Sequence, residues 1–163
     1  MVVAMGHSLL RRSQPNTAAS PTDGHDVVLL DTIGELASCW GLADVAFVGG
    51  SLTNRGGQNM IEPAAYGAAV LFGPNTQNFQ DIVEELLERG GARVVADGNA
   101  LTQRLCELLD DPTTANALGE AARGLVSSRQ GATATTLAIL EDIMPDHAPS
   151  TTATSGSQTA DAA

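Results

Sequence analysis

Short apolar runs alternate with amphipathic segments along the middle of this chain. Four runs have the length and the largely apolar composition of buried strands: residues 27–30, 45–48, 70–73 and 93–96. Runs this short, without polar alternation, are typical of strands that are covered on both faces. The pattern therefore predicts four strands of a parallel sheet.

The segments between these runs have the spacing of helices. The clearest begins at Phe79, where apolar residues at 79, 82, 83, 86 and 87 form one stripe and glutamates lie outside it. Gly90 and Gly91 end that helix. We expect further helices over residues 36–43, 59–66, 101–108 and 118–143.

Strands that alternate with helices predict an α/β fold, with a Rossmann-like parallel sheet and helices on both of its faces. Residues 26–144 would form this domain. Residues 1–25 are expected to be a flexible N-terminal segment or linker and residues 145–163 a disordered tail, because both ends are rich in small and polar residues. Ligands bind beyond the carboxyl ends of strands in such sheets, so the loops after Leu30 and Gly49 are candidate sites.

Charge excludes several classes of partner. The 163-residue chain has a formal net charge of -11, and all eight of its basic residues are scattered arginines. Nucleic acids and anionic membranes both require clustered cations, so we expect neither as a partner of this segment. The absence of an apolar run near 20 residues predicts a soluble, cytoplasmic chain, and the N-terminus carries its charge after its apolar part, unlike a signal peptide.

The cysteines and histidines argue against redox and metal chemistry. Cys39 and Cys106 are far apart in apolar helical patterns, so we expect two reduced, buried thiols. His7, His25 and His147 lie outside the patterned region. The commonest zinc ligand and general base is therefore missing from any plausible site.

A glycine-rich loop follows the second strand and leads into a helix. It contains Gly49-Gly50, then Arg55-Gly56-Gly57, and Arg55 is the only basic residue between Arg12 and Arg89. Bare backbone N–H groups near a helix start, with one guanidinium, suit a phosphate or carboxylate. The alternative is that the glycines only form tight turns and that Arg55 is a solvated cation.

Four ordered motifs together resemble one family. They are Asp-Thr-Ile-Gly-Glu-Leu at 31–36, Ala-Asp-Val-Ala-Phe-Val-Gly-Gly-Ser at 43–51, Arg-Gly-Gly-Gln-Asn-Met-Ile-Glu-Pro-Ala at 55–64, and Leu-Phe-Gly-Pro-Asn-Thr-Gln-Asn-Phe at 71–79. The chain resembles the C-terminal half of 3-deoxy-D-manno-octulosonic acid (Kdo) transferase, a GT-B glycosyltransferase. The resemblance runs from about residue 11 to about residue 140. It implies that residues 26–144 form a nucleotide-sugar-binding domain.

The resemblance implies which residues hold the CMP-Kdo donor. They are Ile33, Gly34, Glu35, Asn59, Met60, Ile61 and Glu62, with Ser51, Arg55, Gly56 and Gly57 as further candidates. Glu62 would accept the ribose hydroxyls, and the backbone of Ile33 and Gly34 would read the cytosine. The phosphate would lie over Gly56, Gly57 and Asn59.

The resemblance also implies what the chain does alone. The family's acceptor domain, with its membrane-associating start and its catalytic glutamate, would be absent, so the chain would hold no catalytic residue and would bind donor without transferring it. The full enzyme would transfer Kdo to a lipid A precursor at the cytoplasmic face of the inner membrane, without metal or cofactor. Gln58 and Met60 depart from the family's usual His and Pro.

Other interpretations stay open on the sequence. Thr32 to Glu35 match a capping box, and Asn59 with Glu62 could likewise serve a helix start. Trp40 and Phe79 are expected in the core. The chain could be a non-catalytic Rossmann-like binding or interaction module, or the donor domain of a GT-B enzyme that uses another sugar nucleotide.

Overall fold

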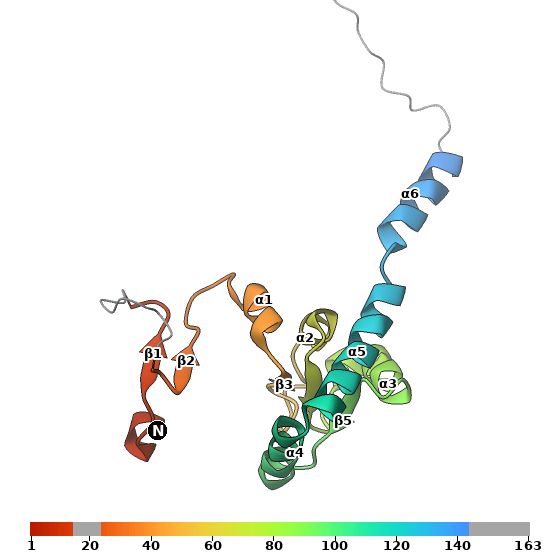
Figure 1. The fold of residues 1–163 in the computed structure, drawn as a ribbon. Coiled ribbons are helices and arrows are strands. Elements are labelled where there is room, and N and C mark those ends of the chain that lie inside the picture. The colour runs from red at the N-terminus through yellow and green to blue at the C-terminus, as the bar shows by residue number, and fades with distance from the viewer. Residues whose placement is uncertain (15–23, 144–163) are drawn as a thin grey trace, which may run out of the picture. The chain divides into compact units, whose positions relative to one another are not determined.

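Parallel strand pairs form two sheets. The computed structural model describes residues 1–14 and 24–143; the expected tail at 145–163 and residues 15–23 of the expected linker lie outside this range. β1 (Leu9–Arg11) pairs with β2 (Val27–Leu29). β3 (Val45–Val48), β4 (Ala69–Phe72) and β5 (Ala92–Val94) form the second sheet in that order (Figure 1).

Helices connect and follow the strands of the second sheet, as the alternating pattern predicted. The α-helices are α1 (Leu36–Cys39), α2 (Ile61–Tyr66), α3 (Gln80–Glu88), α4 (Gly98–Asp110), α5 (Pro112–Ser128) and α6 (Ala132–Ile143). Three short 3₁₀ helices are η1 (Val3–Met5), η2 (Trp40–Leu42) and η3 (Gln77–Phe79). The α/β class and the parallel pairing are therefore as the sequence predicted. The four predicted strands do not form one sheet, because β2 pairs with β1 and only β3, β4 and β5 pair with one another.

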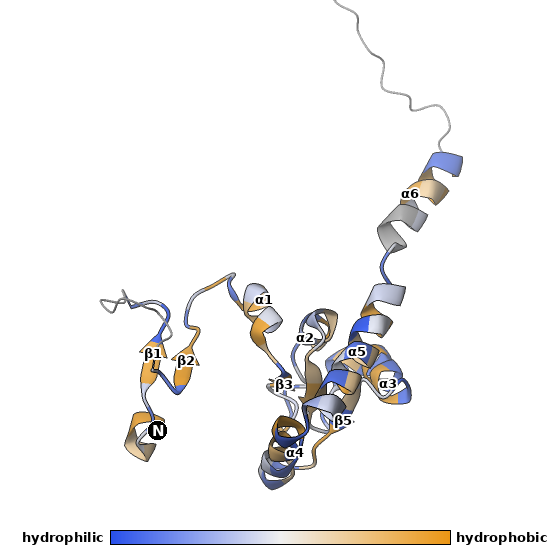
Figure 2. Ribbon diagram, viewed as in Figure 1, coloured by the Kyte–Doolittle hydropathy of each residue, from blue (hydrophilic) through white to orange (hydrophobic). Residues whose placement is uncertain are grey.

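The fully buried strand β4 separates two apolar cores. Val70 and Phe72 pack with residues of α2, α3 and the C-terminal half of α5. Ala69 and Leu71 point to the other face, where α4 and the N-terminal half of α5 cover them. Figure 2 shows α4 with both apolar and polar residues, as expected of a helix with one buried face. Helices thus cover both faces of the sheet.

Helix α5 approaches the backbone at the end of α2 closely. A Cβ atom placed on Gly119 would lie 1.8 Å from the carbonyl oxygen of Gly67. Gly67 is the left-handed residue that ends α2, with φ of 82°. Only glycine therefore fits at position 119, and this contact fixes α2 against α5.

Four further details differ from the sequence-based expectations. The segment expected to be a flexible linker contains η1 and β1, and the helix expected over residues 59–66 begins at Ile61. Cys106 is exposed on α4 and Cys39 is half-buried at the end of α1, so neither thiol is buried as expected. The helix expected to run to residue 143 breaks at Gly131, which has a φ of 111°.

The break after α5 coincides with a division of the chain into two compact units, Met1–Ser128 and Arg129–Ala163. In the described part of the second unit, α6 exposes its large apolar residues. Among the described residues, no helix is both long and apolar enough to cross a membrane. The candidate site lies wholly within the first unit.

Candidate functional site

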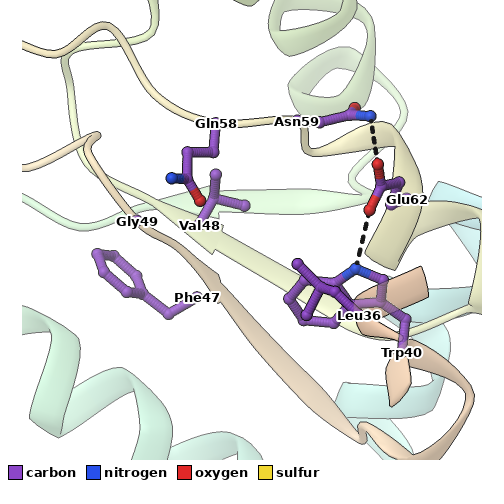
Figure 3. Close-up of a pocket in the computed structure, with 8 residues that line it drawn as sticks. All are labelled: Leu36, Trp40, Phe47, Val48, Gly49, Gln58, Asn59 and Glu62. Carbon is purple, nitrogen blue, oxygen red and sulfur yellow. Dashed lines mark hydrogen bonds between the residues drawn. The ribbon is translucent and has the colours of Figure 1, made fainter. Parts of the chain in front are cut away.

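A pocket of about 260 Å³ opens beyond the carboxyl end of β3. Val48 and Gly49, at the end of that strand, form one part of its wall, and α1, η2 and the start of α2 complete it (Figure 3). Its lining residues are Leu36, Trp40, Phe47, Val48, Gly49, Gln58, Asn59 and Glu62. This is the edge of a parallel sheet at which ligands of doubly wound folds bind.

The Glu62 carboxylate is held by two donors from different parts of the chain. The Asn59 side-chain amide donates to Oε1 at 2.9 Å, and the Trp40 indole N–H donates to Oε2 at 3.2 Å. Figure 3 shows these donors on opposite sides of the carboxylate. Each carboxylate oxygen can accept a second hydrogen bond, so Glu62 has capacity left for two hydroxyl groups of a ligand.

Asn59 also stabilises the start of α2. Its side-chain oxygen accepts a hydrogen bond of 3.0 Å from the backbone N–H of Ile61. The helix-start role considered for Asn59 is therefore present, together with its contact to Glu62. Because both ends of the Asn59 amide are engaged, the side chain is fixed in one orientation.

Gln58 is the polar pocket residue with a free side chain. Its backbone N–H donates to the carbonyl of Gly49 at 3.1 Å, which closes the glycine-rich loop. Its exposed side-chain amide extends toward Gly49 in Figure 3 and has no hydrogen-bond partner among the described residues. Gln58 can therefore both donate to and accept from a bound molecule.

The glycine-rich loop has a backbone that requires glycine. Gly56 and Gly57 have φ of 82° and 78°, and a Cβ on Gly56 would lie 2.7 Å from the side-chain nitrogen of Asn78. That nitrogen donates to the carbonyls of Arg55 and Gly57 at 3.0 and 3.3 Å. The glycines thus form the tight turns considered above and hold the loop against η3.

Two further candidates of the loop differ in exposure. Arg55 is exposed, and its guanidinium has no partner in the part of the chain that the structure describes. Ser51 is fully buried: its hydroxyl donates to the Val48 carbonyl at 2.5 Å and accepts from the Gly73 N–H at 2.8 Å. Arg55 is free to meet an anion, whereas Ser51 joins the ends of β3 and β4.

Met60 and Ile61 do not line the pocket. The Met60 side chain is fully buried in the core beside α2, so only its backbone is available to a ligand. Ile61 is partly exposed at the first position of α2. Sequence patterns could not separate these roles, because an apolar residue at a helix start suits either the core or a ligand.

The candidate loop after β2 lies outside the pocket lining. Ile33 is fully exposed, and Gly34 has φ of 89°. The Glu35 carboxylate accepts hydrogen bonds from the Thr32 hydroxyl and, at 2.9 Å, from the Arg12 guanidinium. These interactions lower the pKa of Glu35, the Thr32 bond most. The capping box considered for Thr32 and Glu35 does not form, because α1 begins without a side-chain cap.

The structure thus gathers part of the predicted set. Asn59 and Glu62 meet in one pocket, and Gln58 and Trp40 join them. Trp40 was assigned to the core from sequence, yet it is half-buried and lines the pocket. A signal existed, because Leu36 and Trp40 are four residues apart on one helical face and a part-buried indole needs an acceptor. Among the described residues, no group of His, Cys, Asp or Glu could hold a metal ion.

Two bacterial proteins are similar to this chain in sequence. The chain is 40% identical over 139 residues to a 3-deoxy-D-manno-octulosonic acid transferase of Bordetella pertussis, covering 85% of this chain and 32% of that protein. The same-named protein of Haemophilus influenzae is 36% identical over 124 residues, covering 76% and 28%. The chain therefore spans about a third of the length of these relatives.

A solved structure matches the fold. The C-terminal CMP-Kdo binding domain of WaaA from Acinetobacter baumannii has a TM-score of 0.65 and 30% sequence identity, and the match covers 78% of this chain and 64% of that one. No family model matches the chain.

Proposed function

We propose that this chain, which belongs to the Kdo transferase family, is a domain that binds the CMP-Kdo donor in the pocket beyond β3. The related WaaA domain of Acinetobacter baumannii binds CMP-Kdo. The pocket combines apolar walls from Leu36, Trp40 and Phe47 with polar groups at its other side. Such a combination suits a nucleotide, which has a flat base and a polar sugar phosphate.

The observation that carries this proposal is the arrangement of Glu62. Its carboxylate lines the pocket and is oriented by Asn59 and Trp40, with one acceptor site left on each oxygen. Two neighbouring hydroxyls of a ribose can donate to those two sites. We therefore assign Glu62 to the ribose of CMP.

The phosphate is assigned to the glycine-rich loop. The Arg55 guanidinium has no partner among the described residues, and a guanidinium can donate two parallel hydrogen bonds to a phosphate. Gln58 lies between that loop and the ribose site, with its amide free. Gly56, Gly57 and Asn59 are assigned to the phosphate, and Ile33, Gly34 and Glu35 are assigned to the base. Gly56 and Gly57 are buried, so the phosphate would meet the loop at its exposed residue Arg55.

Transfer itself is assigned to a larger protein. We propose that the full-length relative of this chain transfers Kdo to a lipid A precursor without a metal ion, at the cytoplasmic face of the inner membrane. Glu62 is tied to two donors, an arrangement that suits binding hydroxyls more than removing a proton. We therefore assign the acceptor site and the general base to a second domain. We assign this chain to the cytoplasm.

Calorimetric titration of the purified chain with CMP, CMP-Kdo and UDP tests the proposal. CMP and CMP-Kdo should bind with submillimolar dissociation constants and UDP more weakly, and Glu62→Ala should weaken CMP binding by about tenfold or more, since it removes charged acceptors. Glu84→Ala, which removes an exposed carboxylate from α3, is the control and should bind like the parent chain. Absence of CMP binding up to millimolar concentrations would refute the proposal.

A further inference from the structure

We propose that Trp40 is a positioning residue that aims the Glu62 carboxylate at the two hydroxyls of a ribose, and that it thereby makes the pocket selective for ribonucleotides over deoxyribonucleotides. The inference rests on the proposed function, because it concerns the same pocket. It gives Trp40 a role in that site. It also predicts a selectivity between nucleotides, which can be measured separately from the affinity for CMP.

The indole is fixed by packing as well as by its hydrogen bond. Trp40 begins η2, which packs against α2, the helix that carries Glu62. A Cβ on Gly41 would lie 3.4 Å from the Tyr66 ring, so η2 and the end of α2 are in close contact. The indole N–H is therefore presented to Glu62 Oε2 from a rigid neighbour, at 3.2 Å.

The second donor is anchored in the same way. Asn59 donates to Glu62 Oε1 at 2.9 Å while its own oxygen accepts from the Ile61 N–H at 3.0 Å. Each carboxylate oxygen thus has one protein donor that cannot move freely. The terminal torsion of a glutamate is broad and unrestrained by itself, so two fixed donors are what define the plane of the carboxylate.

The remaining acceptor sites match a vicinal diol. A carboxylate has about four acceptor sites, two on each oxygen, and Asn59 and Trp40 occupy one on each. One acceptor site is left on each oxygen, and the Glu62 side chain lines the pocket. Without the indole donor, Oε2 would be free to rotate away, and both hydroxyl contacts would lose their geometry together.

The test compares CMP with 2′,3′-dideoxy-CMP on the full chain. Trp40→Phe keeps an aromatic ring in the pocket wall but removes the donor. It should weaken CMP binding about fivefold to tenfold more than it weakens 2′,3′-dideoxy-CMP binding, because only CMP has the hydroxyls that depend on the donor. Tyr66→Phe removes the hydroxyl of an exposed residue outside the pocket and is the control; it should change neither. If Trp40→Phe weakens the binding of both nucleotides equally, or weakens neither, Trp40 is only a packing residue.

A second measurement does not depend on whether Trp40→Phe folds. Trp40 is the only tryptophan of the chain, so its indole N–H gives a single side-chain NMR resonance. In the ligand-free chain, Glu62→Gln should shift this resonance upfield, because the charged acceptor is lost. An unchanged resonance would overturn the inference. A shifted resonance in a chain that binds neither nucleotide would instead refute the proposed function, and with it the role in diol recognition.

Discussion

Polar side chains at the pocket fall into two kinds at the scale of single residues. Asn59 and Trp40 each donate a hydrogen bond to the Glu62 carboxylate, so these three side chains are oriented by hydrogen bonds within the protein. Gln58 has a free amide among the described residues. Substituting the first kind changes both the shape of the site and its contacts, whereas substituting Gln58 removes only contacts to a ligand.

We expect Gln58→Leu to weaken CMP binding about fivefold without lowering the thermal midpoint of unfolding, because the amide makes no internal hydrogen bond that folding would lose. Calorimetry and differential scanning fluorimetry on the same samples measure the two effects. Gln77→Leu, at an exposed position of η3, is the matched control. A lower midpoint with unchanged affinity would place Gln58 in the fold and remove it from the site.

The loop before α1 should respond to acid through Glu35. Its pKa is held below the usual value of 4.5 by the Thr32 hydroxyl first and by the Arg12 guanidinium second. Because the folded-state pKa is depressed, ionised Glu35 stabilises the fold above about pH 4.5, and this contribution is lost as the pH falls below that value. Thr32→Val should raise the pKa of Glu35 toward 4.5, measured by carboxyl ¹³C NMR. An unchanged pKa would contradict the hydrogen bond.

Local sequence could pair Glu62 with Asn59 but could not show the contact between Glu62 and Trp40. A glutamate three residues after an asparagine, behind a glycine-rich loop, is a local pattern, and the structure brings both side chains into one pocket. The Trp40 contact joins residues 22 positions apart and depends on how η2 packs against α2. Met60 shows the same limit, because its burial follows from the packing of α2 on the sheet.

At the scale of elements, the fold depends on the close packing of α5 against the end of α2. We expect Gly119→Ala to destabilise the fold by about 3 kcal/mol, because the new methyl group would meet the Gly67 carbonyl, which is backbone and cannot move aside cheaply. Urea unfolding measures the change. Since α2 carries Glu62, CMP binding should weaken as well.

Gly124→Ala on the same helix is the control for this prediction. Nothing lies within 4 Å of the position that its Cβ would take. Alanine there should stabilise α5 by about 0.5–1 kcal/mol, through its higher helix propensity. Equal effects of the two substitutions would contradict the close contact between Gly119 and Gly67.

Elements with a strong local pattern were predicted, and elements that depend on distant pairing were not. The stripe from Phe79 and the four apolar runs reappear as α3 and as β2 to β5. β1 has only three residues, one of them an arginine, and it exists by pairing with β2 across residues 12–26. A strand so short and so polar at its flanks has no signal in a local window.

At the scale of the whole molecule, the proposed donor site lies in a chain that is shorter than its relatives. The chain spans 32% of the relative from Bordetella pertussis and 28% of the relative from Haemophilus influenzae. The pocket beyond β3 brings together Trp40, Gln58, Asn59 and Glu62, which we propose to bind the nucleotide, and we assign the transfer reaction to a second domain. The central claim is therefore the place at which CMP binds.

Amide and indole NMR shifts of the labelled chain on titration with CMP test that claim most directly. We predict saturable shifts at Gly49, at residues 58–62 and at the Trp40 indole. We predict none at a smaller pocket of about 130 Å³, which is lined by Asp44, Leu108, Leu109, Pro112, Ala115 and Asn116. Shifts confined to that second pocket, or no shifts at millimolar CMP, would contradict the account.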